Sequence, residues 1–229
     1  MAKKITNESF HFYTVSNIAE LTGLEAANLK QLVAQLKTVS LDSVFYHTHK
    51  FLREHLYTGG AFTNDFAYWT GAHTPYKVLS EKLANIDILC FTDLAELRNT
   101  FVETIETFLK DNPDIPNVPK GEEFHFCNMI SIVLPTRYVA RNLSEFAALL
   151  CKVDTGSIYY HFIEARLRLG HRTNDFSNWI DTSIGKAKLA GRIEQLDPYL
   201  DTLQEIREKI VTLIRKDKPW PLRLWPIIK

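Results

Sequence analysis

Two stretches of this chain combine residue types that could do chemistry. Each contains a histidine and, after a short gap, the sequence Asn-Asp-Phe-x-x-Trp. A histidine beside a carboxylate can act in acid–base catalysis, and aromatic, carboxylate and amide groups together suit a polar, hydroxylated ligand. The histidine, acidic and tryptophan residues concerned are His47, Asp65, Trp69, His161, Asp175 and Trp179.

A buried structural network is the first explanation for these residues. His47 lies three residues after Val44 and four before Phe51, so helical spacing places it on the apolar face, where its ring nitrogens need partners. Histidine, aspartate and asparagine would then fix the angle between two helices, with the tryptophans as core anchors. A ligand pocket is the alternative. Its residues would be His47, Asn64, Asp65, Trp69, His161, Arg168, Asn174, Asp175 and Trp179.

No established catalytic, metal or cofactor motif accompanies these stretches. The sequence has no G-x-S-x-G, no phosphate-binding glycine loop and no H-E-x-x-H. Its three cysteines, Cys90, Cys127 and Cys151, form no CxxC pair. We therefore expect no catalytic residue, no metal and no cofactor. An enzyme that uses His–Asp acid–base chemistry is kept as a third possibility.

The composition excludes several classes of protein. The chain has 229 residues, of which 45% are hydrophobic, so it can build a core and is not wholly disordered. Lysine plus arginine equals aspartate plus glutamate at 27 each, so no overall charge attracts nucleic acid or an anionic membrane. No apolar run approaches the length of a membrane-spanning helix, and the start lacks the apolar core of a signal peptide. We expect a cytoplasmic protein that binds neither nucleic acid nor membrane.

The two stretches belong to a longer repeat. Residues 10–47 align with 124–161 at a constant offset of 114, and Thr-Asn-Asp-Phe recurs at 63–66 and 173–176. Preserved order and spacing of this kind indicate an internal duplication. The proline-rich stretch between the copies cannot be helical. We predict copy 1 at 8–110, a linker at 111–121, copy 2 at 122–215 and a tail at 216–229.

Helix caps and the spacing of apolar residues predict a mainly α fold. Asn28 and Asn142 are expected N-caps, and Ser43 and Ser157 are expected to open the next helices. The alternating segment 131–135 predicts a short strand, so each copy has at most a small hairpin at its start. The predicted fold is two tandem copies of a helical module. Later helices are expected at about 75–86, 93–109, 183–196 and 199–215.

The C-terminal tail is rich in proline and tryptophan. Its prolines exclude a helix, and its aliphatic residues and tryptophans make it too apolar to stay free in water. We expect it to pack on its own domain or to dock in the groove of another protein, with Trp220 and Trp225 as the main contacts. A protein partner or self-association through the tail is therefore expected.

The histidine followed by Asn-Asp-Phe-x-x-Trp resembles a prokaryotic domain family of unknown function, whose modules often occur singly. His161, Asn174, Asp175, Phe176 and Trp179 match the pattern best. The resemblance implies no established activity, and its association with genes of sugar metabolism implies a carbohydrate-related ligand or partner. We therefore predict a non-catalytic helical interaction module. The alternative is a binder of a sugar or sugar phosphate that uses the repeated His, Asp and Trp positions.

Overall fold

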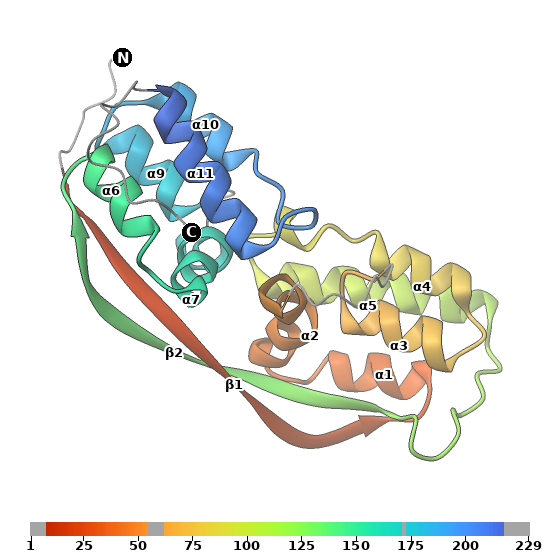
Figure 1. Cartoon of the computed structure of the whole chain (residues 1–229). Coiled ribbons are helices and arrows are strands. Elements are labelled where there is room, and N and C mark those ends of the chain that lie inside the picture. Colours follow the sequence, from red (N-terminus) through yellow and green to blue (C-terminus); the bar gives the residue numbers. More distant parts are fainter. Residues whose placement is uncertain (1–7, 55–61, 171–172, 218–229) are drawn as a thin grey trace. The chain divides into compact units, whose positions relative to one another are not determined.

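The computed structural model describes residues 8–54, 62–170 and 173–217. Two long strands, β1 (Phe10–Ala26) and β2 (Phe124–Ala140), are each followed by a series of helices (Figure 1). After β1 come α1 (Leu29–Leu36), α2 (Leu41–Glu54), α3 (Asp65–His73), α4 (Lys77–Ala84), the 3-10 turn η1 (Ile88–Cys90) and α5 (Leu94–Asp111). After β2 come α6 (Leu143–Leu150), α7 (Thr155–Ile158), the π-helical segment η2 (Tyr159–Glu164), α8 (Ala165–Leu169), α9 (Asp175–Thr182), α10 (Ala187–Glu194) and α11 (Leu203–Asp217). None of these helices, within the described ranges, is long and apolar enough to cross a membrane.

The prediction of a mainly α fold with a short hairpin at the start of each copy is wrong. β1 and β2 are 17 residues each, and they pair with each other in a two-stranded antiparallel sheet. Two side-chain hydrogen bonds between the strands agree with the antiparallel direction. Thr22 Oγ1 donates to the Phe126 carbonyl and Thr136 Oγ1 donates to the Phe12 carbonyl, both at 2.7 Å, so partner numbers fall along β2 as they rise along β1.

The chain forms two compact units, and each strand is divided between them. Unit 1 contains the residues up to Ser16 and those from Ile132 onward, whereas unit 2 is the continuous segment Asn17–Ser131. The helices after β2 therefore pack with the first half of β1, and the helices after β1 pack with the first half of β2. The predicted tandem arrangement of two helical modules is wrong, because the first half of each strand packs with the helices that follow the other strand.

The core of unit 2 is made by α1–α5 together with the first half of β2. α1 begins at the predicted N-cap, since the Asn28 side chain accepts the Gln31 N–H. α3 packs on α4, and α1 and α2 pack on α5. Segment 111–121 also lies in this unit, where the Val118 N–H donates to the Ala27 carbonyl at 2.7 Å. The largest fully buried side chains of the unit are Leu29, Leu32, Leu36, Leu52, Phe66, Phe101 and Phe126.

The core of unit 1 combines α6–α11 with the first half of β1. α6 begins at the predicted N-cap Asn142, which accepts from two backbone N–H groups. The predicted caps Ser43 and Ser157 are wrong, because both lie inside helices. Ser40 Oγ accepts the Ser43 N–H and Asp154 accepts the Ser157 N–H, so polar side chains three residues earlier take the capping role. The largest fully buried side chains of this unit are Phe12, Phe146, Tyr159, Phe162 and Phe176.

We predict that Gly156→Ala destabilises unit 1, because β1 lies directly against α7 at this glycine. A Cβ atom at Gly156 would stand 2.7 Å from the Val15 carbonyl oxygen and 2.7 Å from Thr14 Oγ1. The free energy of unfolding in urea should fall by about 1–3 kcal/mol, the usual cost of overpacking.

Gly191→Ala in α10 is the matched control. Nothing lies within 4 Å of a Cβ at that position. Because alanine favours a helix over glycine, the control variant should be unchanged or more stable by up to about 1 kcal/mol. Equal unfolding free energies for the two variants would contradict the close packing of β1 on α7.

Candidate functional site

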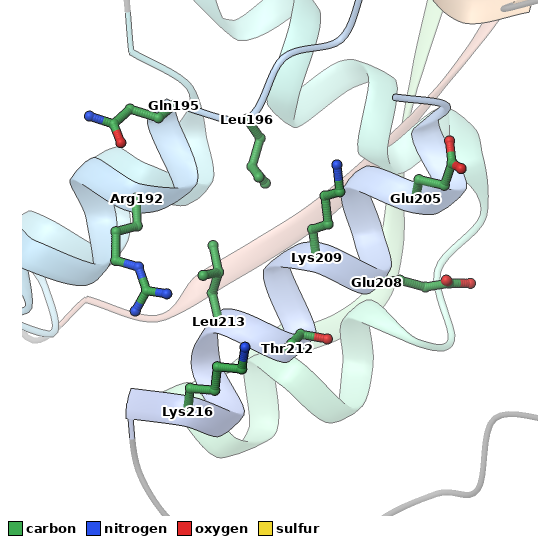
Figure 2. Close-up of a pocket in the computed structure, with 9 residues that line it drawn as sticks. All are labelled: Arg192, Gln195, Leu196, Glu205, Glu208, Lys209, Thr212, Leu213 and Lys216. Atoms are coloured by element: carbon green, nitrogen blue, oxygen red, sulfur yellow. The ribbon is translucent and has the colours of Figure 1, made fainter. Parts of the chain in front are cut away.

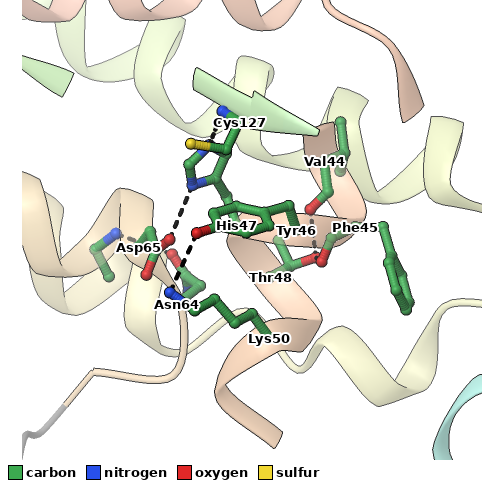
Figure 3. A network of polar contacts seen from close by, with 10 residues as sticks. Val44, Phe45, Tyr46, His47, Thr48, Lys50, Asn64, Asp65 and Cys127 are labelled. Carbon is green, nitrogen blue, oxygen red and sulfur yellow. Dashed lines mark hydrogen bonds and ion pairs between the residues drawn. The ribbon is translucent and has the colours of Figure 1, made fainter. Parts of the chain in front are cut away.

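In unit 2 the predicted histidine, His47, forms a hydrogen bond with the backbone of β2 (Figure 3). His47 in α2 is 4% exposed, and its Nδ1 lies 2.8 Å from Asp65 Oδ2 at the start of α3. Its Nε2 accepts the backbone N–H of Cys127 at 3.0 Å. A ring nitrogen that accepts a hydrogen bond carries no proton, so the proton of the neutral ring is on Nδ1 and is donated to Asp65. One side chain thus joins α2, α3 and β2.

The same arrangement occurs in unit 1 around His161. This residue is 3% exposed, its Nδ1 lies 2.6 Å from Asp175 Oδ2, and its Nε2 accepts the Tyr13 N–H at 2.8 Å. The elements joined are η2, α9 and β1. Asp175 is more enclosed than Asp65, with side-chain exposures of 14% and 44%. The two histidines also differ in setting, because His161 lies in a π-helical turn and His47 in a regular α-helix.

The two predicted tryptophans donate hydrogen bonds to backbone carbonyls just before each strand begins. Trp69 Nε1 donates to the Glu122 carbonyl at 2.8 Å, and Trp179 Nε1 donates to the Glu8 carbonyl at 2.7 Å. Both tryptophans are buried. The helices of each unit therefore make two hydrogen bonds to the backbone at the start of a strand. A tryptophan N–H donates one of them, and a histidine ring nitrogen accepts the other.

The predicted asparagines cap the helices that carry the acidic residues. Asn64 Oδ1 accepts the Ala67 N–H at the start of α3, and Asn174 Oδ1 accepts the Ser177 N–H at the start of α9, both at 2.9 Å. Asn64 also donates to the Leu83 carbonyl at 2.9 Å, which ties α3 to the end of α4. These side chains fix the helix ends that place the two carboxylates.

The aromatic residues of the strands fill the remaining space, and sequence patterns did not predict their partners. In unit 1 the Phe10 ring centroid lies 4.8 Å from His161 and 5.5 Å from Trp179, and Phe12 stacks on Phe146 at 5.4 Å. Burial of each phenylalanine contributes about 1.5–3 kcal/mol. The sequence offers one signal for these contacts, because Phe-His-Phe stands at 10–12 and again at 124–126. The ring of Phe124 contacts His47, as the ring of Phe10 contacts His161.

The structure thus brings His, Asp, Asn and Trp together in each unit, around a strand of the chain itself. Both nitrogens of each histidine are engaged, so neither is placed to take a proton from a substrate. Within the described ranges no three His, Cys, Asp or Glu side chains gather where they could hold a metal ion. The side chain of Arg168 and the tail residues Trp220 and Trp225 lie outside the described part of the chain.

A surface hollow of about 610 Å³ lies between α10 and α11 of unit 1 (Figure 2). It mixes cationic, acidic, amide and aliphatic side chains. They are Arg192, Gln195, Leu196, Glu205, Glu208, Lys209, Thr212, Leu213 and Lys216.

The charges of this hollow are explained by the helices that carry them. Glu205 accepts from the Thr202 N–H and hydroxyl while Thr202 Oγ1 accepts the Glu205 N–H, a reciprocal N-terminal cap for α11. Lys209 pairs with Asp201 at 2.5 Å, and Glu208 accepts from a glutamine side chain at 2.7 Å. Arg192 and Lys216 lie in the last turns of α10 and α11, where a cation offsets the helix dipole. The hollow therefore defines no particular ligand.

The reciprocal cap also corrects a predicted helix boundary. The sequence analysis expects the last helix to start at about residue 199, but α11 begins at Leu203. Asp197 instead accepts the Tyr199 N–H within a turn, so its capping chemistry serves the turn before the helix.

A family model described as a family of unknown function (DUF5752) matches residues 7–215. The chain belongs to this family. No curated protein matches this DUF5752 chain. Among solved structures it is similar to OrfY from Thermoproteus tenax, with a TM-score of 0.78 and 23% identity, over 96% of this chain and 99% of that one. At this identity the likeness shows a shared fold, and the family description carries no activity.

We predict that His161→Ala and Asp175→Ala each lower the free energy of unfolding by about 2 kcal/mol or more, because each leaves a buried polar group unpaired. The double variant should cost less than the sum of the single variants by at least about 0.5 kcal/mol, since both act on one network. Urea unfolding of the four chains measures this coupling. Strictly additive effects would contradict the network.

His73→Ala serves as a control for this series. Its Nδ1 lies 3.2 Å from Glu122 Oε2, but the side chain is 30% exposed and the pair lies at the surface. The unfolding free energy of this variant should stay within about 0.5 kcal/mol of the wild type.

We predict that Cys127 reacts slowly with iodoacetamide, because burial raises the pKa of its thiol and little thiolate exists at neutral pH. Cys90, which is exposed, should react first. The rate at Cys127 should rise as the pH approaches the raised pKa. His47→Ala should increase this rate, because it removes the hydrogen bond to the Cys127 N–H. Mass spectrometry of the labelled peptides gives each rate, and equal rates at Cys90 and Cys127 would contradict the enclosed position of Cys127.

Proposed function

We propose that this protein is a non-catalytic interaction module and that it associates with a second copy of itself through the exposed halves of its strands. One observation carries the proposal. In the described part of the chain, seven of the twelve exposed large hydrophobic side chains lie in residues 16–25 of β1 and 130–139 of β2. They are Ile18, Leu21, Leu24, Ile130, Ile132, Val133 and Leu134.

The second halves of the strands differ sharply from the first halves. No residue from Ser16 to Glu25, and none from Ile130 to Val139, is buried. We name these ranges the outer segments. Leu21 is 79% exposed, and Ile132, Val133 and Leu134 are three consecutive exposed apolar residues. Scattered exposed hydrophobic residues are ordinary, but a run of them on one element is typical of a contact surface.

The charges of the outer segments favour a second copy as the partner. Segment 16–25 contains two carboxylates, Glu20 and Glu25, and no lysine or arginine. Segment 130–139 contains Arg137 and no acidic residue. In a twofold dimer, residue i of one copy contacts residue j of the other and the reverse contact follows by symmetry. The acidic segment of each copy would then meet the basic segment of its partner.

The geometry of the His, Asp and Trp set offers little support to the sugar-binding and enzyme hypotheses. The polar atoms of the His, Asp and Trp set contact the chain's own backbone and helix ends. A sugar or sugar phosphate would have to break these hydrogen bonds before it could use the same atoms. An acid–base mechanism meets the same obstacle.

We predict that the wild-type chain is a dimer and that Ile132→Lys with Leu134→Lys makes it a monomer, because two charges would be buried in the contact. Light scattering during size-exclusion chromatography, over a range of concentrations, gives the mass. The matched control is Leu200→Lys, since Leu200 is 80% exposed and lies off the strands. This control should remain a dimer.

Two outcomes would overturn the proposal. One is a wild-type chain that is monomeric at all concentrations. The other is a dimer that survives the two strand lysines but is lost in Trp220→Ala with Trp225→Ala, which would assign self-association to the tail.

A further inference from the structure

The first half of β1 contacts the helices of unit 1 as a short peptide would contact a receptor. Its contacts with the helices fall within residues 8–15: the Glu8 carbonyl to Trp179, the Phe10 and Phe12 rings to the aromatic set, and the Tyr13 N–H to His161. Thr14 Oγ1 adds a hydrogen bond of 2.6 Å to Asp154.

The contacts also have the form of strand recognition. Phe10 and Phe12 are buried, while His11 between them is exposed, so alternate side chains enter the socket. Backbone groups give affinity and the pockets for alternate side chains give specificity, as in other domains that bind extended peptides. The socket, which we define as Asp154, His161, Trp179 and the rings of Phe146 and Phe176, therefore reads the pattern aromatic-x-aromatic.

The connection that follows residues 8–15 pairs with β2, where Thr22 Oγ1 donates to the Phe126 carbonyl at 2.7 Å, but it places no side chain in a core. No residue of the outer segment 16–25 is buried, so this connection adds no core side chain that would fix the position of residues 8–15. At about 3.3 Å per residue, ten extended residues span roughly 33 Å. Residues 8–15 can leave the socket without removing a side chain from the core of unit 2.

From these observations we propose that the socket of unit 1 is a binding site for an extended peptide with aromatic residues at alternate positions, and that residues 8–15 of a second copy can fill it. Exchange of an identical element between copies preserves every contact of that element, so its cost is low. The inference does not depend on the proposed function, because the socket is formed by side chains of unit 1, whereas the proposed function rests on the exposed apolar side chains of the outer segments. The outer segment 130–139 contributes to residues 8–15 a hydrogen bond of 2.7 Å, from Thr136 Oγ1 to the Phe12 carbonyl.

Thr14 and Asp154 give the socket a means to choose between the strands. The first half of β2 has the same aromatic pattern, but Asn128 Oδ1 there lies 2.8 Å from Ser40 Oγ. A carboxylate in unit 1 favours a hydroxyl donor, whereas the serine in unit 2 pairs with an amide oxygen. A peptide of residues 8–16 should therefore bind unit 1 better than a peptide of residues 122–130.

The test uses the full chain with Phe10→Ala and Phe12→Ala, which weakens its own strand in the socket. A fluorescent peptide of residues 8–16, Glu-Ser-Phe-His-Phe-Tyr-Thr-Val-Ser, is titrated with this protein and its anisotropy is measured. We expect saturable binding at least 100-fold tighter than to the wild-type chain, whose own strand occupies the socket at high effective concentration. A peptide with both phenylalanines changed to alanine should not bind, and adding His161→Ala to the protein should weaken binding at least tenfold.

A second measurement covers the case in which the double alanine variant does not fold, as judged by circular dichroism. The wild-type chain is incubated with excess labelled peptide for hours, and incorporation is followed as residues 8–15 open and close. Slow incorporation that is blocked by unlabelled peptide of the same sequence is expected. No binding in either experiment would overturn the inference.

The two proposals are separated by the strand lysines. Ile132→Lys with Leu134→Lys, introduced together with Phe10→Ala and Phe12→Ala, should leave the affinity for the peptide unchanged within threefold. A loss of peptide binding in this background would show that the outer segments make the site, and would contradict an acceptor formed by the helices.

Discussion

The hydrogen bonds from the edges of β1 and β2 to the two histidines are the contacts on which the rest of the fold depends. A strand at the edge of a sheet leaves backbone N–H groups without partners, and a buried unpaired N–H is costly. Each histidine accepts one such N–H group at a ring nitrogen, which requires that the other ring nitrogen carry the proton. Asp65 and Asp175 secure that tautomer, and the asparagine caps place the helices that carry them. Helix ends, ring protonation and strand position are thus fixed together.

Sequence reasoning identified the side chains of this network but not the strand backbone with which they form hydrogen bonds. His47 is expected on an apolar helix face and in need of partners, and Asp65 is expected to join it in a network that fixes the angle between two helices. Both follow from helical spacing, which is local. The second partner, the Cys127 N–H, lies 80 residues away, and no periodic pattern encodes a contact at that distance. The grouping of His161 with Asp175 was foreseen on the same local grounds, whereas its bond to Tyr13 was not.

The strands were underestimated for a physical reason. A half-buried strand shows alternating apolar and polar residues, but the outer segments are exposed over ten residues and show little alternation. Only 131–135 gave a signal, and it predicted a short strand. The long strands are stabilised by pairing with each other and by the contacts of their first halves with the helices. Both are tertiary effects. The serine caps failed in a similar way, because Ser40 and Asp154 outcompete them from three residues earlier.

The division of the strands between units sets an order of events during synthesis. Unit 2 is continuous from Asn17 to Ser131, so all its parts exist once that segment has left the ribosome. Unit 1 needs residues 8–15 together with helices that end at Asp217. Residues 8–15 are made before unit 2, and the helices that form their socket are made after it. Domains generally fold as units as the chain emerges. Phe10 and Phe12, which lie on β1, therefore remain without their socket while all of unit 2 is synthesised, and a chaperone that binds exposed aromatic side chains can reach them during that time.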